Sequence, residues 1–237
     1  MGGVSPAPWA TSEDGGLNLG LNVSDSAARV AINRSLAAER LGAPVAFATQ
    51  VHGDTVLGLG AAERVQWASR RPPASAGEAD ALVTAERGLG LGVLVADCVP
   101  VLLADPEARV VGVAHAGRKG VLAGVVHRAL DALVARGADP ARVRAAVGPA
   151  VCGRCYEVPG AMRDEVASAV PETFSTTSAG TPGLDLPSGV VAQLAARGVV
   201  AVRVERCTLE DPDLFSHRRA SAAGTTTGRQ AGIIALI

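Results

Sequence analysis

Three residues of the sequence have side chains that could together bind a metal ion or carry out covalent chemistry: His52, Cys98 and His115. Each histidine is closely followed by glycine where a strand is expected to end, and such positions commonly present functional side chains. Imidazole and thiolate are zinc ligands, and a set of three leaves a fourth position open, as in catalytic zinc sites. An open metal site is therefore one interpretation, although none of the short zinc-binding signatures is present.

The second interpretation makes Cys98 a nucleophile that is activated by His115. Asp97 is its neighbour in sequence, but strand alternation would point this carboxylate to the opposite face unless the strand is bulged. A buried, hydrogen-bonded carboxylate is then the simplest expectation for Asp97. Residue spacing alone does not choose between a metal ligand and a nucleophile at Cys98.

The segment that would bring Cys98 and His115 together is residues 89–120, two apolar β-type runs joined by Asp-Pro-Glu-Ala at 105–108. Asp-Pro is a strong turn signal because proline presets φ at the second turn position. A two-residue turn centred on Pro106 and Glu107 would place Cys98 directly opposite His115, with Cβ atoms roughly 4.5–5.5 Å apart. The sequence therefore predicts a hairpin that carries both side chains on one face.

Other polar groups offer weaker signals. Cys152 and Cys155 have the spacing of a redox motif but do not open a helix in a thioredoxin-like context, so we expect them to shape a pocket wall. Arg34 lies within an expected helix, where a solvated arginine is the default. The basic residues that could bind phosphate or carboxylate, or equally be scattered surface charges, are Arg118, Lys119, Arg218, Arg219 and Arg229.

The apolar periodicity predicts alternating helices and strands around this hairpin. Helices are expected at Ala27–Leu41, 120–136, 160–170 and 188–197, and further strands at 44–50, 55–59, 79–84, 143–147, 199–204 and 232–237. The mixture of a hairpin with helix-strand alternation favours an α/β (α+β) sandwich with mixed β-sheets. No GxGxxG or P-loop motif occurs, which argues against a doubly wound nucleotide-binding fold.

Composition restricts the classes of partner. The 237 residues carry a formal net charge of -1 and are 48% hydrophobic, which suits one domain over residues 1–237 with a sizeable core. Lys119 is the single lysine, so neither a nucleic-acid-binding face nor a polybasic membrane segment is expected. Without a signal peptide or an apolar run of membrane-spanning length, we expect a cytoplasmic protein whose four cysteines are thiols or ligands.

With these residues in view, the chain resembles the laccase-domain or polyphenol-oxidase family, whose members are also described as purine nucleoside phosphorylases or peptidoglycan editing factors. The resemblance runs over nearly the whole chain, and its ordered motifs are specific as a set. The matching segments are GGVS and LNLGLNVSD near the N-terminus, NR at Asn33, QVHGD at Gln50, ADALVT at Ala79, ADCVPVLL at Ala96, AHAG at Ala114, GPAVCGRCYEV at Gly148, LDLPSGVVAQL at Leu184, CT at Cys207, FSHRR at Phe215 and TGRQAG at Thr227.

This resemblance implies that His52, Cys98 and His115 are metal ligands, normally for one zinc ion, with copper as the other candidate. It implies a purine nucleoside cleaved by phosphate, adenosine deamination as an additional activity, and a sandwich similar to cytotoxic-necrotizing-factor-type catalytic domains. The candidate catalytic residues are Cys98, His115 and Arg34, and the candidate substrate-binding residues are Gln50, Arg218 and Arg219.

One departure from the family pattern concerns the segment after AHAG. Relatives usually have WRG, whereas this chain has Arg118-Lys119-Gly120, so the aromatic ring expected in the pocket wall is replaced by charged side chains.

Other functions stay open at this point. A multicopper oxidase needs a histidine-rich trinuclear cluster, and four histidines in the whole chain argue against it. An amidase or editing hydrolase of a peptidoglycan precursor could use a metal-bound water or Cys98. A binding module with a structural zinc ion is disfavoured because only three ligands are apparent. A monomer or a homodimer is expected.

Overall fold

A six-stranded mixed sheet forms the middle of the computed structural model, which describes residues 16–69 and 72–237. The GGVS match lies outside the described residues. The strand order is β10-β7-β5-β6-β3-β2. In this order the strands span Val200–Arg203, Arg144–Val147, Val99–Asp105, Val110–Ala116, Ala81–Thr84 and Val56–Leu59.

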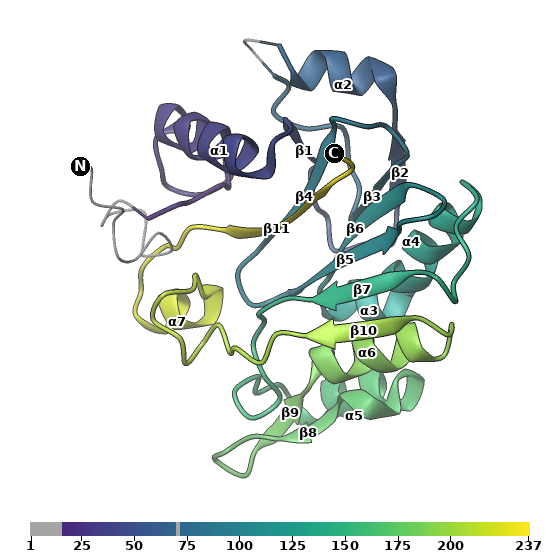
Figure 1. Cartoon of the computed structure of the whole chain (residues 1–237). Helices are drawn as coiled ribbons and strands as arrows, with labels where there is room; N and C mark the ends of the chain where they lie inside the picture. Colours follow the sequence, from purple (N-terminus) through teal and green to yellow (C-terminus); the bar gives the residue numbers. More distant parts are fainter. Residues whose placement is uncertain (1–15, 70–71) are drawn as a thin grey trace.

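A second sheet of three strands packs against the large one (Figure 1). Its order is β1-β4-β11, formed by Val45–Phe47, Gly90–Val95 and Gln230–Ala235, with β4 parallel to β1 and antiparallel to β11. Helices α3 (Arg118–Ala123), α4 (Val125–Val134) and α6 (Leu186–Ala195) cover the other face of the large sheet. Three layers result, and the mixed α/β class expected from the sequence is confirmed.

The remaining elements lie around these layers. A short ribbon of β8 and β9 contacts α5, and α7 lies between β10 and β11 in the chain (Figure 1). Their bounds are α1 (Ala27–Leu41), α2 (Ala61–Trp67), α5 (Gly160–Ala169), the 3-10 helix η2 (Pro171–Thr173), β8 (Phe174–Thr176), β9 (Pro182–Leu184) and α7 (His217–Ala222). The prediction for α1 is confirmed to the residue, whereas α2, α7 and the β8-β9 ribbon were not predicted.

Burial on both faces explains why β5 reads as a continuous apolar run. Val101 and Leu103 face the helical layer, whereas Leu102 packs in the cluster between the two sheets. A sheet covered on both sides needs apolar residues at successive positions rather than at alternate ones.

The helix predicted over residues 120–136 is divided in two. Gly124, with φ 81°, separates α3 from α4.

The central hairpin differs from the prediction in two ways. Residues 89–104 are not one arm: β4 belongs to the small sheet and β5 to the large one, and Asp97 with φ 89° lies in the connection. The pairing of β5 with β6 places His115 opposite Pro100, so the predicted direct opposition of Cys98 and His115 is wrong.

The reason for the changed register is the loop. A two-residue hairpin turn requires positive φ at its central positions, which Pro106 cannot adopt. The chain instead uses a four-residue loop that ends at Arg109 with φ 53°, and Asp105 pairs with Val110. The shift moves the pairing by two residues rather than one, and an even shift keeps every side chain on its original face.

Asp105 stabilises the loop of residues 106–109 through its side chain. Its buried carboxylate accepts hydrogen bonds from the backbone of Glu107, Ala108 and Asp139, at 2.9–3.0 Å, and from Arg142 at 3.1 Å. We expect Asp105→Ala to lower the free energy of unfolding by about 2–4 kcal/mol, because these donors lose their partner. Urea unfolding checks this. Glu107→Ala, in the same loop with a side chain 76% exposed, should change stability by less than about 0.5 kcal/mol; equal losses would contradict the assignment.

Candidate metal centre and cavity

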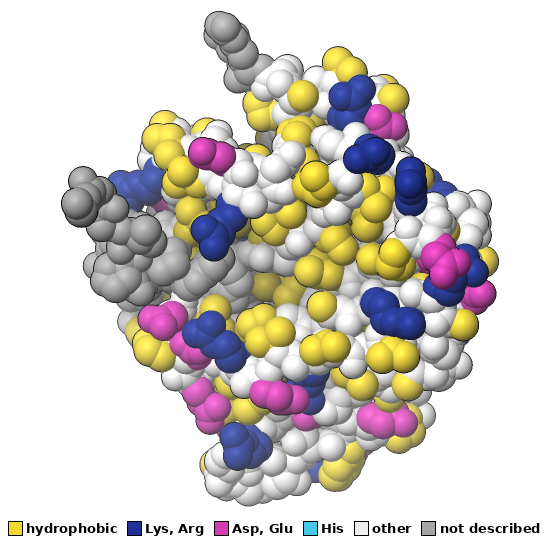
Figure 2. Space-filling model, viewed as in Figure 1, with side chains coloured by type: hydrophobic (Ala, Val, Ile, Leu, Met, Phe, Trp, Pro, Cys, Tyr) yellow, Lys and Arg dark blue, Asp and Glu magenta, His cyan; other side chains and the backbone are white. Residues whose placement is uncertain are grey.

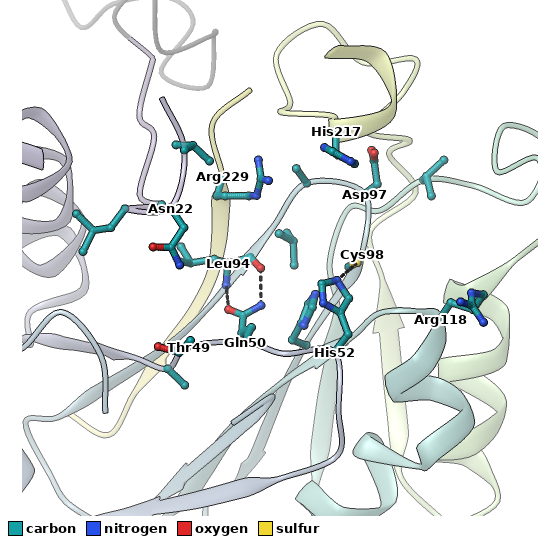
Figure 3. A pocket seen from close by; sticks show the side chains of 18 of the residues that line it. Asn22, Thr49, Gln50, His52, Leu94, Asp97, Cys98, Arg118, His217 and Arg229 are labelled. Carbon is teal, nitrogen blue, oxygen red and sulfur yellow. Dashed lines mark hydrogen bonds between the residues drawn. The ribbon is translucent and has the colours of Figure 1, made fainter. Parts of the chain in front are cut away.

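His52, Cys98 and His115 converge from three separate parts of the fold. His52 follows β1 in a turn with φ 62°, Cys98 follows Asp97 in the connection from β4 to β5, and His115 lies near the end of β6. The three potential ligand atoms all lie within 4.8 Å of one another. Cys98 Sγ is 3.9 Å from His52 Nε2, and the two imidazole rings meet edge to face at a centroid distance of 4.7 Å (Figure 3).

Asp80 holds two of these residues in place. Its carboxylate, 1% exposed at the start of β3, accepts backbone hydrogen bonds from Val51, His52 and Gly53 at 3.1, 2.9 and 2.7 Å. The same carboxylate accepts the Nδ1 hydrogen of His115 at 2.8 Å, which directs Nε2 of that ring towards Cys98. A carboxylate behind a histidine ligand is a common feature of protein metal sites. Sequence analysis missed this role, although an aspartate opening an otherwise apolar strand was a signal.

Electrostatics favour a thiolate at Cys98. Burial alone would raise the pKa of this thiol, but hydrogen bonds and charge from His115 and His52 outweigh burial and lower the pKa from 9.0 to about 6. Burial likewise opposes protonation of His115, yet Asp80 and Cys98 raise its pKa to about 9. Asp80, His115 and Cys98 therefore stabilise one another's charged forms. A metal ion bound between Cys98 and His115 would take the place of the proton that these two residues share.

This donor set fits a divalent metal ion. Two imidazoles and one thiolate suit zinc or copper, and three protein ligands leave a position for water or substrate. Gly117 keeps the surrounding space open: a Cβ at this position would lie 2.9 Å from His52 Cδ2 and 3.1 Å from Cys98 Sγ. A side chain at position 117 would therefore displace His52 or Cys98 from its present place.

The lowered pKa of Cys98 leads to a prediction for the metal-free protein. Because the pKa is depressed, the thiolate is present above about pH 6 and is lost by protonation below it. We expect iodoacetamide to alkylate Cys98 with a midpoint near pH 6, measured by peptide mass spectrometry on chelator-treated protein. Cys155 is the internal control, because burial raises the pKa of its thiol. Parallel pH profiles for the two cysteines would contradict the assignment.

A cavity of about 900 Å³ opens beside the three residues (Figure 3). Its lining includes His52, Cys98 and His115 together with five arginine or lysine side chains. Asp97 is the single acidic residue that the described part of the chain contributes to the lining. The basic residues are Arg34, Arg118, Lys119, Arg218 and Arg229. A cavity with this charge balance suits an anionic ligand or co-substrate.

The surface charge elsewhere is mixed. On the face seen in Figure 2, acidic and basic side chains are interspersed around apolar ones, and no uniformly basic stripe crosses that face. Among the described residues, no helix is long and apolar enough to cross a membrane.

Arg34 and Gln50 both line the cavity, and each already makes two hydrogen bonds to backbone groups. Arg34 donates to the carbonyls of Leu19 and Ala74, and its guanidinium lies over the ring of Phe47, so the expectation of a solvated arginine is wrong. Burial lowers the pKa of Arg34 to about 10. The Gln50 amide makes two 2.8 Å hydrogen bonds with the backbone of Leu94, which connect the segment after β1 to β4 (Figure 3).

The adjacent arginines at 218 and 219 have different surroundings. Arg218 lines the cavity, with its guanidinium 4.9 Å from the ring centre of Tyr156. Arg219, expected to bind substrate, does not line the cavity. Its guanidinium instead donates to carbonyls within residues 208–214, and its backbone N–H donates to the capping Ser216 at the start of α7.

Asp97 joins this loop to the cavity. Its carboxylate accepts hydrogen bonds from Thr208 Oγ1 at 2.6 Å and from the backbone of Arg218 at 2.7 Å. The expectation of a hydrogen-bonded carboxylate is confirmed, but Asp97 lies in the cavity wall rather than on the far face of a strand. Its positive φ turns the chain here.

Tyr156 supplies an aromatic surface that the sequence analysis did not identify. It is the one tyrosine of the chain, and it lines the cavity beside Arg218. The segment Arg118-Lys119, which replaces the usual Trp-Arg, lines the same cavity with charged side chains. Among the described residues, Tyr156 is therefore the one Phe, Trp or Tyr side chain in the wall.

This chain is similar to known proteins in both sequence and fold. A protein of Streptomyces griseus named purine nucleoside phosphorylase is 54% identical over 98% of this chain and 90% of its own length. A protein of Streptomyces coelicolor with the same name is 50% identical over 98% of this chain and 91% of its own. The crystal structure of YlmD from Geobacillus stearothermophilus superposes with a TM-score of 0.81 at 32% identity, covering 100% of this chain and 88% of that one.

A second solved structure, the hypothetical protein YfiH of Bacillus licheniformis, gives the same TM-score of 0.81 at 32% identity over 94% of this chain and 86% of that one. These superpositions support the mixed α/β class. The sequence profile described as multi-copper polyphenol oxidoreductase laccase matches residues 1–237. The chain therefore belongs to the family that carries this description, as its motifs indicated.

Proposed function

We propose that this protein is a purine nucleoside phosphorylase that uses a zinc ion bound by His52, Cys98 and His115. The observation that carries the proposal is the opening of this ligand group into a cavity lined by five basic side chains and one carboxylate. Relatives 42–54% identical to this chain are named purine nucleoside phosphorylases. The substrates are accordingly a purine nucleoside and inorganic phosphate.

Phosphate is proposed to bind near Arg118 and Arg218. The guanidinium of Arg218 lies 4.9 Å from the ring centre of Tyr156, and Arg118 and Cys98 line the same cavity. Guanidinium groups bind phosphate oxygens bidentately and would hold the nucleophile against the ribose carbon. The ring of Tyr156 offers an apolar surface for the sugar or the base.

The metal ligands are proposed to act at the purine. A bound divalent ion would supply Lewis acidity there and lower the pKa of a bound water. Asp80 keeps His115 in the tautomer that presents Nε2, and the low pKa of Cys98 keeps its sulfur as thiolate at neutral pH. Adenosine deamination at the same centre is the additional activity, because it needs the same open metal position.

The decisive experiment incubates zinc-loaded protein with adenosine or inosine, with and without phosphate, and measures base, ribose 1-phosphate and inosine by chromatography. We expect base release that depends on phosphate and equals ribose 1-phosphate. Inosine formed from adenosine would identify the deaminase activity. Absence of base release from either nucleoside would overturn the proposal.

The copper oxidase alternative has weaker support. Of the four histidines, only His52 and His115 belong to a candidate metal group among the described residues, too few for a trinuclear copper cluster. Oxygen consumption by copper-loaded protein with a phenol would favour this alternative. A peptidoglycan-precursor amidase lacks a specific supporting contact.

We further propose a cytoplasmic location, which suits four free thiols. The proposed assembly is a monomer or a homodimer, with one catalytic domain over residues 1–237.

Arg218 provides a test of the phosphate site. We expect Arg218→Ala to raise the KM for phosphate about tenfold or more, with a smaller change in the KM for the nucleoside, because a charge-assisted hydrogen bond to phosphate is lost. Initial rates at varied phosphate measure this. Arg87→Ala, at an exposed turn outside the cavity, should leave both constants unchanged. Equal changes in the two KM values would argue against phosphate at Arg218.

A further inference from the structure

A second group of metal-binding side chains lies behind the cavity wall. Cys152, Cys155, Cys207 and Glu210 place their ligand atoms within 4.8 Å of one another. They come from two loops, residues 150–157 after β7 and 206–211 after β10. None of these four residues belongs to the cavity lining or to the group around His52.

The backbone brings the cysteines together. The two loops continue the parallel pairing of β7 and β10 through a bridge between Ala150 and Cys207, and the backbone N–H of Cys152 points at Cys207 Sγ at 3.4 Å. The N–H of Cys155 donates to the carbonyl of Cys152 at 2.9 Å, a tight turn that returns the second thiol of Cys-Gly-Arg-Cys to the first. All three cysteines are partly buried free thiols.

The geometry points to a structural zinc site formed by Cys152, Cys155, Cys207 and Glu210. Closed sites with four protein ligands, mainly thiolates and often including a Cys-x-x-Cys pair, are typical of structural zinc. Three thiols supply the soft donors from the interior, and the exposed Glu210 closes the set from the solvent side.

Its position gives this site a positioning role. Between the two cysteine-bearing loops lies the connection that carries Cys98: the N–H of Val151 donates to the carbonyl of Asp97 at 3.0 Å, and Thr208 Oγ1 donates to its carboxylate. A zinc ion that links the loop of Cys152 and Cys155 to the loop of Cys207 and Glu210 would also hold Val151 and Thr208, two of the hydrogen-bond donors to Asp97, in place. The wall residue Tyr156, next to Cys155, would be fixed with them.

The test measures zinc per chain by elemental analysis after loading and removal of excess metal. Wild-type protein is expected to hold about two zinc ions, and His52→Asn and Cys155→Ser about one each. The double variant should hold none. A wild-type content of one that His52→Asn abolishes would overturn the proposal, as would a Cys152–Cys155 disulfide found by mass spectrometry of the alkylated, unreduced protein.

A second measurement does not require removing any of the three cysteines. Cobalt(II) added to a His52→Asn/Cys98→Ala variant can meet thiolates only at Cys152, Cys155 and Cys207. We expect the intense sulfur-to-cobalt charge-transfer absorption and the visible bands of a tetrahedral site, displaced by added zinc. Glu210→Gln in the same background should weaken cobalt binding while retaining the thiolate bands. Octahedral, weakly absorbing cobalt would overturn the proposal even if Cys155→Ser failed to fold.

Discussion

Replacing His52 by asparagine is expected to remove the metal ion at the His52, Cys98 and His115 group and to lower kcat/KM for phosphorolysis by more than about 100-fold. Loss of an outer partner of a metal ligand typically costs 10–100-fold, and loss of the ligand itself should exceed that range. Asparagine is chosen because position 52 has φ 62°, which asparagine tolerates better than alanine does. The side chain is exposed, so folding should be preserved.

His127→Asn is the matched control for this variant. His127 lies on α4, outside the cavity lining, with Arg197 and Asp131 as its charged neighbours. Its replacement should leave metal content and turnover within about twofold of the wild type. Elemental analysis and the chromatographic assay report both quantities. Full activity in His52→Asn would remove the metal group from the mechanism.

Asp80→Asn is expected to weaken both the fold and the metal site. In the native carboxylate, Oδ2 accepts from Val51 and Gly53, and Oδ1 accepts from His52 and His115. The asparagine amide keeps one accepting oxygen and places its NH2 group, which cannot accept, against two of the four N–H donors. We expect the free energy of unfolding to fall by about 2–4 kcal/mol, because two buried donors lose their acceptor. Zinc affinity at this centre should fall about 10–100-fold.

Asp54→Asn provides the comparison for this prediction. Asp54 follows the same turn, but its side chain is 38% exposed and forms a 3.4 Å ion pair with the exposed Arg128. Its replacement should change stability by less than about 0.5 kcal/mol. Urea unfolding of the metal-free proteins and competition with a chromogenic chelator measure the two effects. If both variants lose equal stability and affinity, Asp80 has no special role in positioning His52 and His115.

The sequence predicted that Cys98 and His115 lie close together because of the period-two alternation of strands. The predicted register was wrong by two residues, yet an even error preserves the face, so Cys98 and His115 still converge. The apolar run at 89–104 reads as one strand because β4 and β5 are both buried on two faces, which removes the alternation that would separate them. The positive φ of Asp97, which sends the chain into the other sheet, has no signature in residue type.

Other features depended on contacts between distant segments. Arg218 and Arg219 are chemically identical, and nothing in residue type shows that the carbonyls of residues 208–214 bind the guanidinium of Arg219 while Arg218 lines the cavity. Arg34 was expected in solvent because its partners Leu19, Phe47 and Ala74 lie in other elements. Helix α1, by contrast, was predicted to the residue because its ends are local, with Gly42 at φ 79° stopping it.

The edge strand β11 carries a consequence for synthesis of this protein on the ribosome. Arg229, just before β11, is bound through its backbone by Asn18 and Leu19, and Asn18 lies 211 residues earlier. At about 5–20 residues per second, roughly 10–40 s separate the translation of these two residues. Until then β4 has one unpaired apolar edge, exposed to chaperones and to aggregation. His52, Cys98 and His115 emerge long before Arg229, so a nascent chain contains its candidate metal ligands well before the cavity wall is complete.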